Sequence, residues 1–221
     1  MKKSFTILVF ASMCISTLAV AQRASRWEIG IQGEYGRDWY HKTYAREIFY
    51  EGSITDFSSS RSWGTGIYFE KPLNPKFSMI GQLGYAVKKV HPEIFHTYNN
   101  TASQHYLSEV HHRGAVDAGL RWYLNPGSKV RFFAEGKLGA NVFISAVQQE
   151  QRFGRIVRSD VFGFERVAPV ASGSLGLKWS RLTVSAEYRQ DLITSKRYDG
   201  RTGIDGKGVF GKVGFALLRG K

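Results

Sequence analysis

Apolar and polar residues alternate along this chain with a period of two, in eight separate runs. Strict alternation of this kind predicts half-buried β-strands, and no stretch offers a competing helical period. The eight runs cover residues 27–37, 63–70, 77–88, 116–124, 130–144, 171–179, 182–189 and 209–218. The pattern therefore predicts an all-β protein.

Short and long connections alternate between these runs. Residues 72–75, 125–128 and 180–181 are short and have tight-turn compositions, whereas residues 38–61, 89–112, 148–167 and 194–207 are long and polar. Tight turns at one end and long loops at the other are typical of outer-membrane barrels. The sequence therefore predicts an eight-stranded antiparallel up-and-down transmembrane β-barrel.

The first residues have the pattern of a secretory signal peptide. Lys2 and Lys3 precede a broken apolar stretch, and Ala19-Val20-Ala21 is a small-x-small cleavage pattern. We expect residues 1–21 to be removed and residues 22–221 to form one barrel domain. Removal of this segment takes away two lysines, which lowers the formal charge from +13 to +11. It also takes away the single cysteine, Cys14. A basic balance suits anionic lipid headgroups, and we expect no nucleic-acid partner for an exported chain.

The polar face of the strands is expected to line the barrel and the apolar face to meet lipid. An eight-stranded lumen is just wide enough for side chains, and the polar face is rich in Gly, Ala and Ser. A slip of one residue in run 182–189 would turn Glu187 and Arg189 toward lipid, which costs roughly 2–4 kcal/mol for a basic side chain at mid-bilayer. Fourteen charged residues are expected to form a structural ion-pair network in the lumen: Glu28, Glu34, Glu70, Lys88, Asp117, Arg121, Arg131, Glu135, Lys137, Lys178, Glu187, Arg189, Asp191 and Lys212.

Aromatic residues gather at the strand ends of the apolar face. Two such rows match the two interfaces of a bilayer, where aromatic side chains are enriched. The predicted girdle consists of Trp27, Trp63, Phe69, Phe77, Trp122, Phe132, Trp179 and Phe215, with Tyr35, Tyr85 and Tyr188 on the loop side.

Over residues 27–221 this architecture resembles the small, porin-like outer-membrane β-barrel families, of which OmpA-type and OmpX-type barrels are familiar members. The resemblance rests on the signal, the strands and the alternating connections rather than on a motif. It implies a bacterial outer-membrane location, contact with outer-membrane lipid and lipopolysaccharide, and insertion by the barrel assembly machinery. Many such barrels end on an aromatic residue, for which Phe215 is the nearest substitute here.

No catalytic, cofactor-binding or metal site is predicted. The barrel families include lipid A-modifying enzymes that use a histidine with a serine and an acid, but no predicted strand places a histidine beside a serine on the apolar face. Five histidines fall in or around the second long loop, where we interpret them as solvated rather than metal-binding: His91, His96, His105, His111 and His112. Arg152, Arg155 and Arg158 in the third long loop suit either a lipopolysaccharide phosphate or simple loop solubility.

The sequence thus favours a non-enzymatic outer-membrane barrel with a packed polar lumen. Its expected role is structural, adhesive or surface-binding, with an unidentified surface ligand at the loops. Three alternatives remain open on the sequence: a small porin or channel, a lipid A-modifying barrel enzyme, and a soluble periplasmic barrel that carries a ligand.

Overall fold

The computed structural model describes residues 27–44, 56–90, 107–152, 155–161, 167–193, 195–196 and 202–220. These residues form ten strands: β1 (Glu28–Tyr44), β2 (Asp56–Pro72), β3 (Phe77–Val90), β4 (Leu107–Tyr123), β5 (Val130–Arg152), β6 (Arg155–Val161), β7 (Val167–Trp179), β8 (Leu182–Asp191), β9 (Ser195–Lys196) and β10 (Thr202–Arg219). Within these ranges no helix is long and apolar enough to cross a membrane. The predicted signal peptide, residues 1–21, lies outside the described residues.

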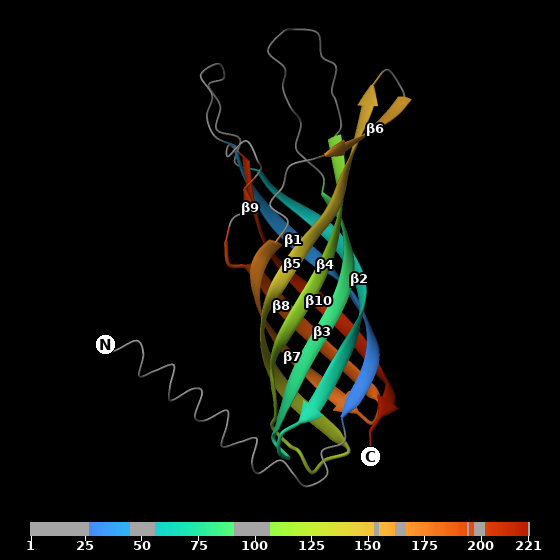
Figure 1. Cartoon of the computed structure of the whole chain (residues 1–221), viewed down its shortest axis with the longest axis vertical. Coiled ribbons are helices and arrows are strands. Elements are labelled where there is room, and N and C mark those ends of the chain that lie inside the picture. Colours follow the sequence, from blue (N-terminus) through green and yellow to red (C-terminus); the bar gives the residue numbers. More distant parts are fainter. Residues whose placement is uncertain are drawn as a thin grey trace, which may run out of the picture.

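Eight long strands close into a barrel (Figure 1). They pair antiparallel in the order β1-β2-β3-β4-β5-β7-β8-β10, and β10 pairs in turn with β1 from Glu28↔Arg219 to Tyr44↔Thr202. Closure leaves no free edge along the wall, so every strand has a neighbour on both sides for its backbone hydrogen bonds. The predicted eight-stranded up-and-down barrel is confirmed.

Three tight turns lie at one end of the barrel, called the turn end here, where the C-terminus also lies (Figure 1). Between β2 and β3 the Asn74 side-chain oxygen accepts hydrogen bonds from the backbone N–H groups of Lys76 and Phe77, both at 2.9 Å. Between β4 and β5 the Asn125 side chain accepts from the Phe132 N–H at 2.6 Å. Between β7 and β8 the chain reverses through Ser180 and Arg181, with Ser180 at φ 51°. Side-chain caps and a positive φ let these short segments turn back directly.

At the opposite end, the loop end, the strands run farther than the sequence predicted. Residues 38–61 were expected as a loop, yet β1 continues to Tyr44 and β2 starts at Asp56, in unbroken register to Lys42↔Asp56. Likewise β3 continues to Val90 and β4 starts at Leu107. Alternation marks only strands with one apolar face, so it misses ladder pairing that continues where both faces are polar.

Two further expectations about loops are wrong for the same reason. Within residues 148–167, β5 runs to Arg152 and β6 folds back on it with pairs from Ala146↔Val161 to Arg152↔Arg155. This hairpin projects beyond the barrel at the loop end (Figure 1). Within residues 194–207, β9 pairs with β10 at Gly203↔Lys196. The side chains of Arg152, Arg155 and Arg158 lie outside the described part, as do residues 91, 96 and 105.

Candidate functional site

The wall of the barrel has its apolar side chains outside and its charged side chains inside. Leu138 and Leu175 point outward with 66% and 69% of their surface exposed, whereas Lys178 and Glu187 point inward with 1% each. Every acidic residue whose side chain is described faces the lumen: Glu28, Glu34, Asp38, Glu70, Asp117, Glu135, Glu187 and Asp191. The interior of the barrel is therefore the site at which this chain concentrates its charge.

The first group of ion pairs lies toward the turn end. The Arg121 guanidinium contacts Glu70 Oε2 at 2.8 Å and Glu135 Oε2 at 2.7 Å. The Lys178 ammonium contacts Glu70 Oε2 at 2.7 Å and also binds Glu28. Each cation thus contacts two carboxylates, so the low-dielectric interior holds paired rather than isolated charges.

Two residues that the sequence analysis did not select complete this group. The Tyr123 hydroxyl donates to Glu70 Oε1 at 2.6 Å, which gives that carboxylate a third partner. Arg219, at the end of β10, contacts Glu28 Oε1 at 2.9 Å. Tyr123 has no formal charge, so a selection of charged residues leaves it out, and Arg219 lies one residue beyond the alternating run 209–218.

The second group occupies the middle of the lumen and centres on Glu187. Its carboxylate contacts Lys137 Nζ at 2.5 Å, Arg189 Nη2 at 2.7 Å and Lys212 Nζ at 2.8 Å. Arg189 and Lys212 also contact Glu34 Oε2, at 2.9 and 3.4 Å. Because Lys137 further contacts Glu135 Oε1 at 2.6 Å, the two groups form one continuous network.

The third group lies toward the loop end and consists of pairs across the lumen. Lys88 contacts Asp38 Oδ2 at 3.0 Å, and Arg113 contacts Asp191 Oδ2 at 3.9 Å. The Asn141 amide also donates to Asp191 Oδ1 at 3.1 Å. Asp38 was expected in the loop 38–61, and Arg113 lies between the expected loop 89–112 and the run 116–124, so neither was selected. They add one acid and one base to the seven of each that were selected.

Two of the predicted network residues have other surroundings. Asp117 is buried but makes no ion pair within 4.0 Å among the described residues; it lies against its cross-strand neighbour Gly139. The Arg131 guanidinium stacks on the Tyr123 ring, 4.3 Å from its centroid. The other twelve predicted residues each contact an oppositely charged side chain.

Inward aromatic rings fill much of the remaining lumen, and three of them lie directly across from a glycine on the next strand. The pairs are Tyr68↔Gly30, Phe133↔Gly176 and Phe210↔Gly36. A Cβ atom at Gly176 would lie 2.6 Å from Phe133 Cζ, and one at Gly30 would lie 2.4 Å from the Tyr68 ring. Glycine on the polar face therefore makes room for specific rings, in addition to suiting a narrow lumen.

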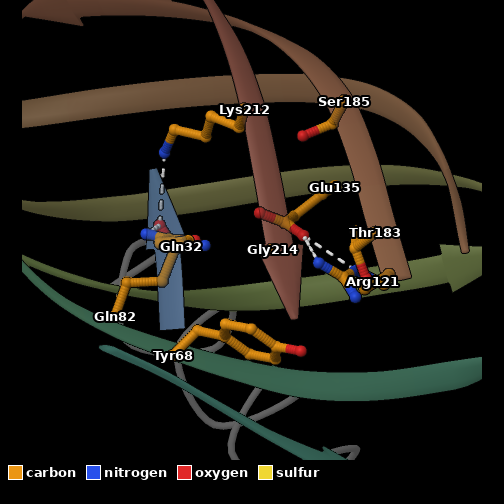
Figure 2. Close-up of a pocket in the computed structure, with 9 residues that line it drawn as sticks. All are labelled: Gln32, Tyr68, Gln82, Arg121, Glu135, Thr183, Ser185, Lys212 and Gly214. Atoms are coloured by element: carbon orange, nitrogen blue, oxygen red, sulfur yellow. Dashed lines mark hydrogen bonds and ion pairs between the residues drawn. The ribbon is translucent and has the colours of Figure 1, made fainter. Parts of the chain in front are cut away.

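A small cavity is lined by residues of both the first and the second ion-pair group. It measures about 20 Å³, which is room for water but not for a solute path. Figure 2 shows the Arg121–Glu135 pair on one side and Lys212 directed at Gln82 and Gln32 on the other. The hydroxyls of Tyr68 and Thr183, which line it, have no hydrogen-bond partner in the described part of the protein.

The predicted girdle residues all lie on the outward face. Seven of them are exposed, namely Trp27, Trp63, Phe77, Trp122, Phe132, Trp179 and Phe215, and Phe69 is half-buried. Tyr35, Tyr85 and Tyr188 are exposed near the loop end. Between the two groups of aromatic residues, the outward face carries mainly Ile, Leu, Val, Ala and Gly.

One expectation about the apolar face is wrong. We expected no histidine beside a serine there, yet His112 points outward directly opposite Ser145, because β5 carries a bulge at this point. In the described part of the chain these two side chains share no hydrogen bond, and His112 Nδ1 instead bonds the Tyr85 hydroxyl at 2.5 Å. The interpretation of His111 as a solvated loop residue is also wrong. His111 lies on β4, points into the lumen with 1% of its surface exposed, and packs edge-on against Phe143.

Comparisons with known proteins agree with this architecture. No protein-family model matches the sequence, and no curated protein is significantly similar to it. The outer membrane protein OprG from Pseudomonas aeruginosa has a similar structure, with a TM-score of 0.57 at 10% identity, covering 88% of this chain and 96% of that chain.

Two other solved structures were also matched. Neisserial surface protein A (NspA) gives a TM-score of 0.43 at 10% identity, covering 86% of this chain and 97% of that chain. Ail, the attachment invasion locus protein of Yersinia pestis, gives 0.38 at 12% identity, covering 85% and 99%.

Proposed function

We propose that this chain is an integral barrel of the bacterial outer membrane, exported by its signal peptide, with a filled lumen and a structural or surface-binding role rather than a catalytic one. The observation that carries the proposal is the inversion of the wall, with apolar side chains outside and a neutralised set of charges inside. In water, this arrangement would expose a continuous apolar surface far larger than soluble monomers tolerate. In lipid the same surface is favourable, and the paired charges are shielded.

The height of the apolar band supports a membrane setting. On β2 the outward face runs from Arg61 to Lys71 with only Trp63, Thr65, Ile67 and Phe69 between them. Ten residues at about 3.3 Å each span about 33 Å along the strand, or about 25 Å along the barrel axis at a tilt near 40°. The hydrocarbon band of outer-membrane barrels is about 25 Å tall.

The lumen supports a closed barrel over a small porin or channel. Eight strands leave an interior that side chains just fill, and here charged groups, aromatic rings and glutamines meet across it. The soluble-carrier alternative requires the opposite orientation of the wall.

The proposal of a non-enzymatic role rests on the surroundings of His112. A serine nucleophile needs a base within hydrogen-bond reach and a third group that orients the base. His112 instead bonds a tyrosine hydroxyl, and within the described residues no group of three or more metal-ligating side chains is present. Lipid A of unchanged mass after overexpression is the expected result, whereas loss or gain of an acyl chain would assign an enzyme.

We expect the surface-binding role to belong to the strands that continue beyond the apolar band at the loop end. The β5–β6 hairpin stands beyond the barrel at the loop end (Figure 1). Long, solvated external loops on a rigid barrel are a suitable scaffold for binding lipopolysaccharide or a surface ligand. We expect the barrel assembly machinery to insert the chain.

One pair of variants tests the membrane setting directly. Val184 and Gln190 lie on the outward face of β8, six residues apart, the first within the band and the second at its loop-end border. In lipid, Val184→Arg should be clearly destabilising, by at most the roughly 2–4 kcal/mol of a basic side chain at mid-bilayer, and Gln190→Arg should cost close to nothing. Urea unfolding of each variant in phospholipid vesicles measures the difference, and fractionation with unheated and heated gels identifies the inserted barrel. Equal, negligible effects of both variants, with the protein in the soluble fraction, would overturn the proposal in favour of a soluble carrier.

A further inference from the structure

Three basic residues form a continuous row on the outward face near the loop end. Arg37 on β1 lies directly opposite Arg61 on β2, and Arg61 lies directly opposite Lys89 on β3. All three side chains are exposed. Residues paired in this way have Cβ atoms about 4.5–5.5 Å apart, so the row places three positive charges side by side.

The row has no internal compensation in the described part of the structure. Directly opposed like charges destabilise a sheet, and inside the barrel every cation of the network has a carboxylate or an aromatic ring against it. By contrast, the described side chains offer Arg37, Arg61 and Lys89 no acidic partner, because each described carboxylate faces the lumen. A row of this kind is favourable where an anion lies against it, and the described side chains supply none.

The level of the basic row relative to the apolar band indicates which anion can reach it. The next outward row toward the turn end is Tyr35↔Trp63↔Val87, and the one after that is Gly33↔Thr65↔Tyr85. Further along the same three strands come Ile31↔Ile67↔Leu83, which are apolar. The basic row therefore lies immediately outside the aromatic border of the apolar band, which is the level of lipid headgroups.

We propose that Arg37, Arg61 and Lys89 form a binding site for the phosphate groups of a glycolipid in the outer leaflet. The proposal rests on the proposed function, because it requires the band to be embedded in a membrane. The two guanidinium groups can bind phosphate oxygens through paired N–H donors, and the ammonium group adds a third charge. Tyr35 and Trp63 lie directly below, where they can pack against the lipid's sugar and upper acyl chains.

The test uses the full chain in phosphatidylcholine vesicles, alone or with bis-phosphorylated lipid A, dephosphorylated lipid A or phosphatidylglycerol. The measured quantity is the temperature at which the folded band on an unheated gel is lost. Arg61→Gln removes the centre of the row. Lys71→Gln is the matched control, since Lys71 is an exposed lysine on the same face of β2 that lies opposite Met79 instead of a basic residue.

We expect phosphorylated lipid A to raise this temperature for the natural sequence and for Lys71→Gln, and dephosphorylated lipid A to leave it unchanged. Arg61→Gln should lose most of the increase and bind phosphorylated lipid A at least tenfold more weakly. In phosphatidylcholine alone Arg61→Gln should be as stable as the natural sequence or more stable, because repulsion along the row is relieved.

Three results would overturn the site, and each is distinct from failure of the membrane barrel. If phosphorylated lipid A raised the temperature equally for Arg61→Gln and Lys71→Gln, the row would not be a specific binding site. An equal increase with phosphatidylglycerol would indicate nonspecific surface charge. No increase with any lipid would leave an acidic protein partner as the occupant. In all three cases a folded, heat-modifiable band in phosphatidylcholine keeps the proposed function intact, whereas absence of that band would overturn the proposed function itself.

Discussion

At the scale of single residues, the lumen shows how many charges can be enclosed when each is shared. An isolated ion in a low-dielectric interior costs many kcal/mol, and a pair recovers that cost only with good geometry and additional hydrogen bonds. Glu187 contacts three cations, and Glu70 contacts two cations and a tyrosine hydroxyl. Sharing of this kind fixes several strands relative to one another through one carboxylate.

Glu187→Gln should therefore destabilise the barrel strongly. The amide keeps the shape of the side chain but leaves Lys137, Arg189 and Lys212 short of one negative charge, and breaking a buried ion pair costs about 3–5 kcal/mol. Urea unfolding in vesicles, followed by tryptophan fluorescence, measures the loss. Asp117→Asn is the matched control, because this acid is buried without an ion pair among the described residues, and its effect should be below about 1 kcal/mol. Similar effects of the two variants would contradict a special role for Glu187.

At the scale of elements, neighbouring strands are fitted together by pairs of a ring and a glycine. Phe133 on β5 covers Gly176 on β7, and Phe210 on β10 covers Gly36 on β1. Such cross-strand pairs are local units of sheet stabilisation, and they also fix register, because a slip of one residue would send the ring outward. Each of the three glycines thus leaves space for one aromatic ring of the neighbouring strand.

Gly176→Ala tests this fit between strands. The new Cβ would lie 2.5 Å from the Val184 backbone oxygen and 2.6 Å from Phe133 Cζ, so the strands or the ring must shift. Overpacking of this kind costs about 1–3 kcal/mol, measured by the same unfolding experiment. Gly136→Ala, on the outward face of β5, has nothing within 4 Å of the new Cβ and should be neutral or slightly stabilising. A neutral result at Gly176 would mean that the ring is not held by the glycine.

At the scale of the whole molecule, closure of the sheet and filling of the lumen act together. The continuous network runs from Arg219 at the turn end through the middle of the barrel to Glu34, and the Lys88–Asp38 and Arg113–Asp191 pairs lie beyond it toward the loop end. The charged side chains inside the barrel thus join its strands across the lumen, from the turn end toward the loop end.

We expect no steady single-channel conductance from the purified barrel in planar bilayers at neutral pH. The physical reason is that ions would have to displace paired charges from a lumen whose described cavity is only about 20 Å³. Insertion must be verified on the same sample by the unheated gel. A stable, ion-selective current in several independent preparations would contradict the filled lumen and favour the channel alternative.

The fold class, the number of barrel strands and the inward set of charges could be predicted from the alternation, because a half-buried strand imposes a period of two. The tight turns could be predicted from their composition. Twelve of the fourteen selected charged residues meet opposite charges in the lumen. The sequence pattern did not predict the last residues of the strands at the loop end, because strand pairing there continues without an apolar face. Nor did it bring together Arg37, Arg61 and Lys89, or Phe133 and Gly176. Those neighbours lie on different strands, and only the register of the closed sheet decides which residues stand side by side.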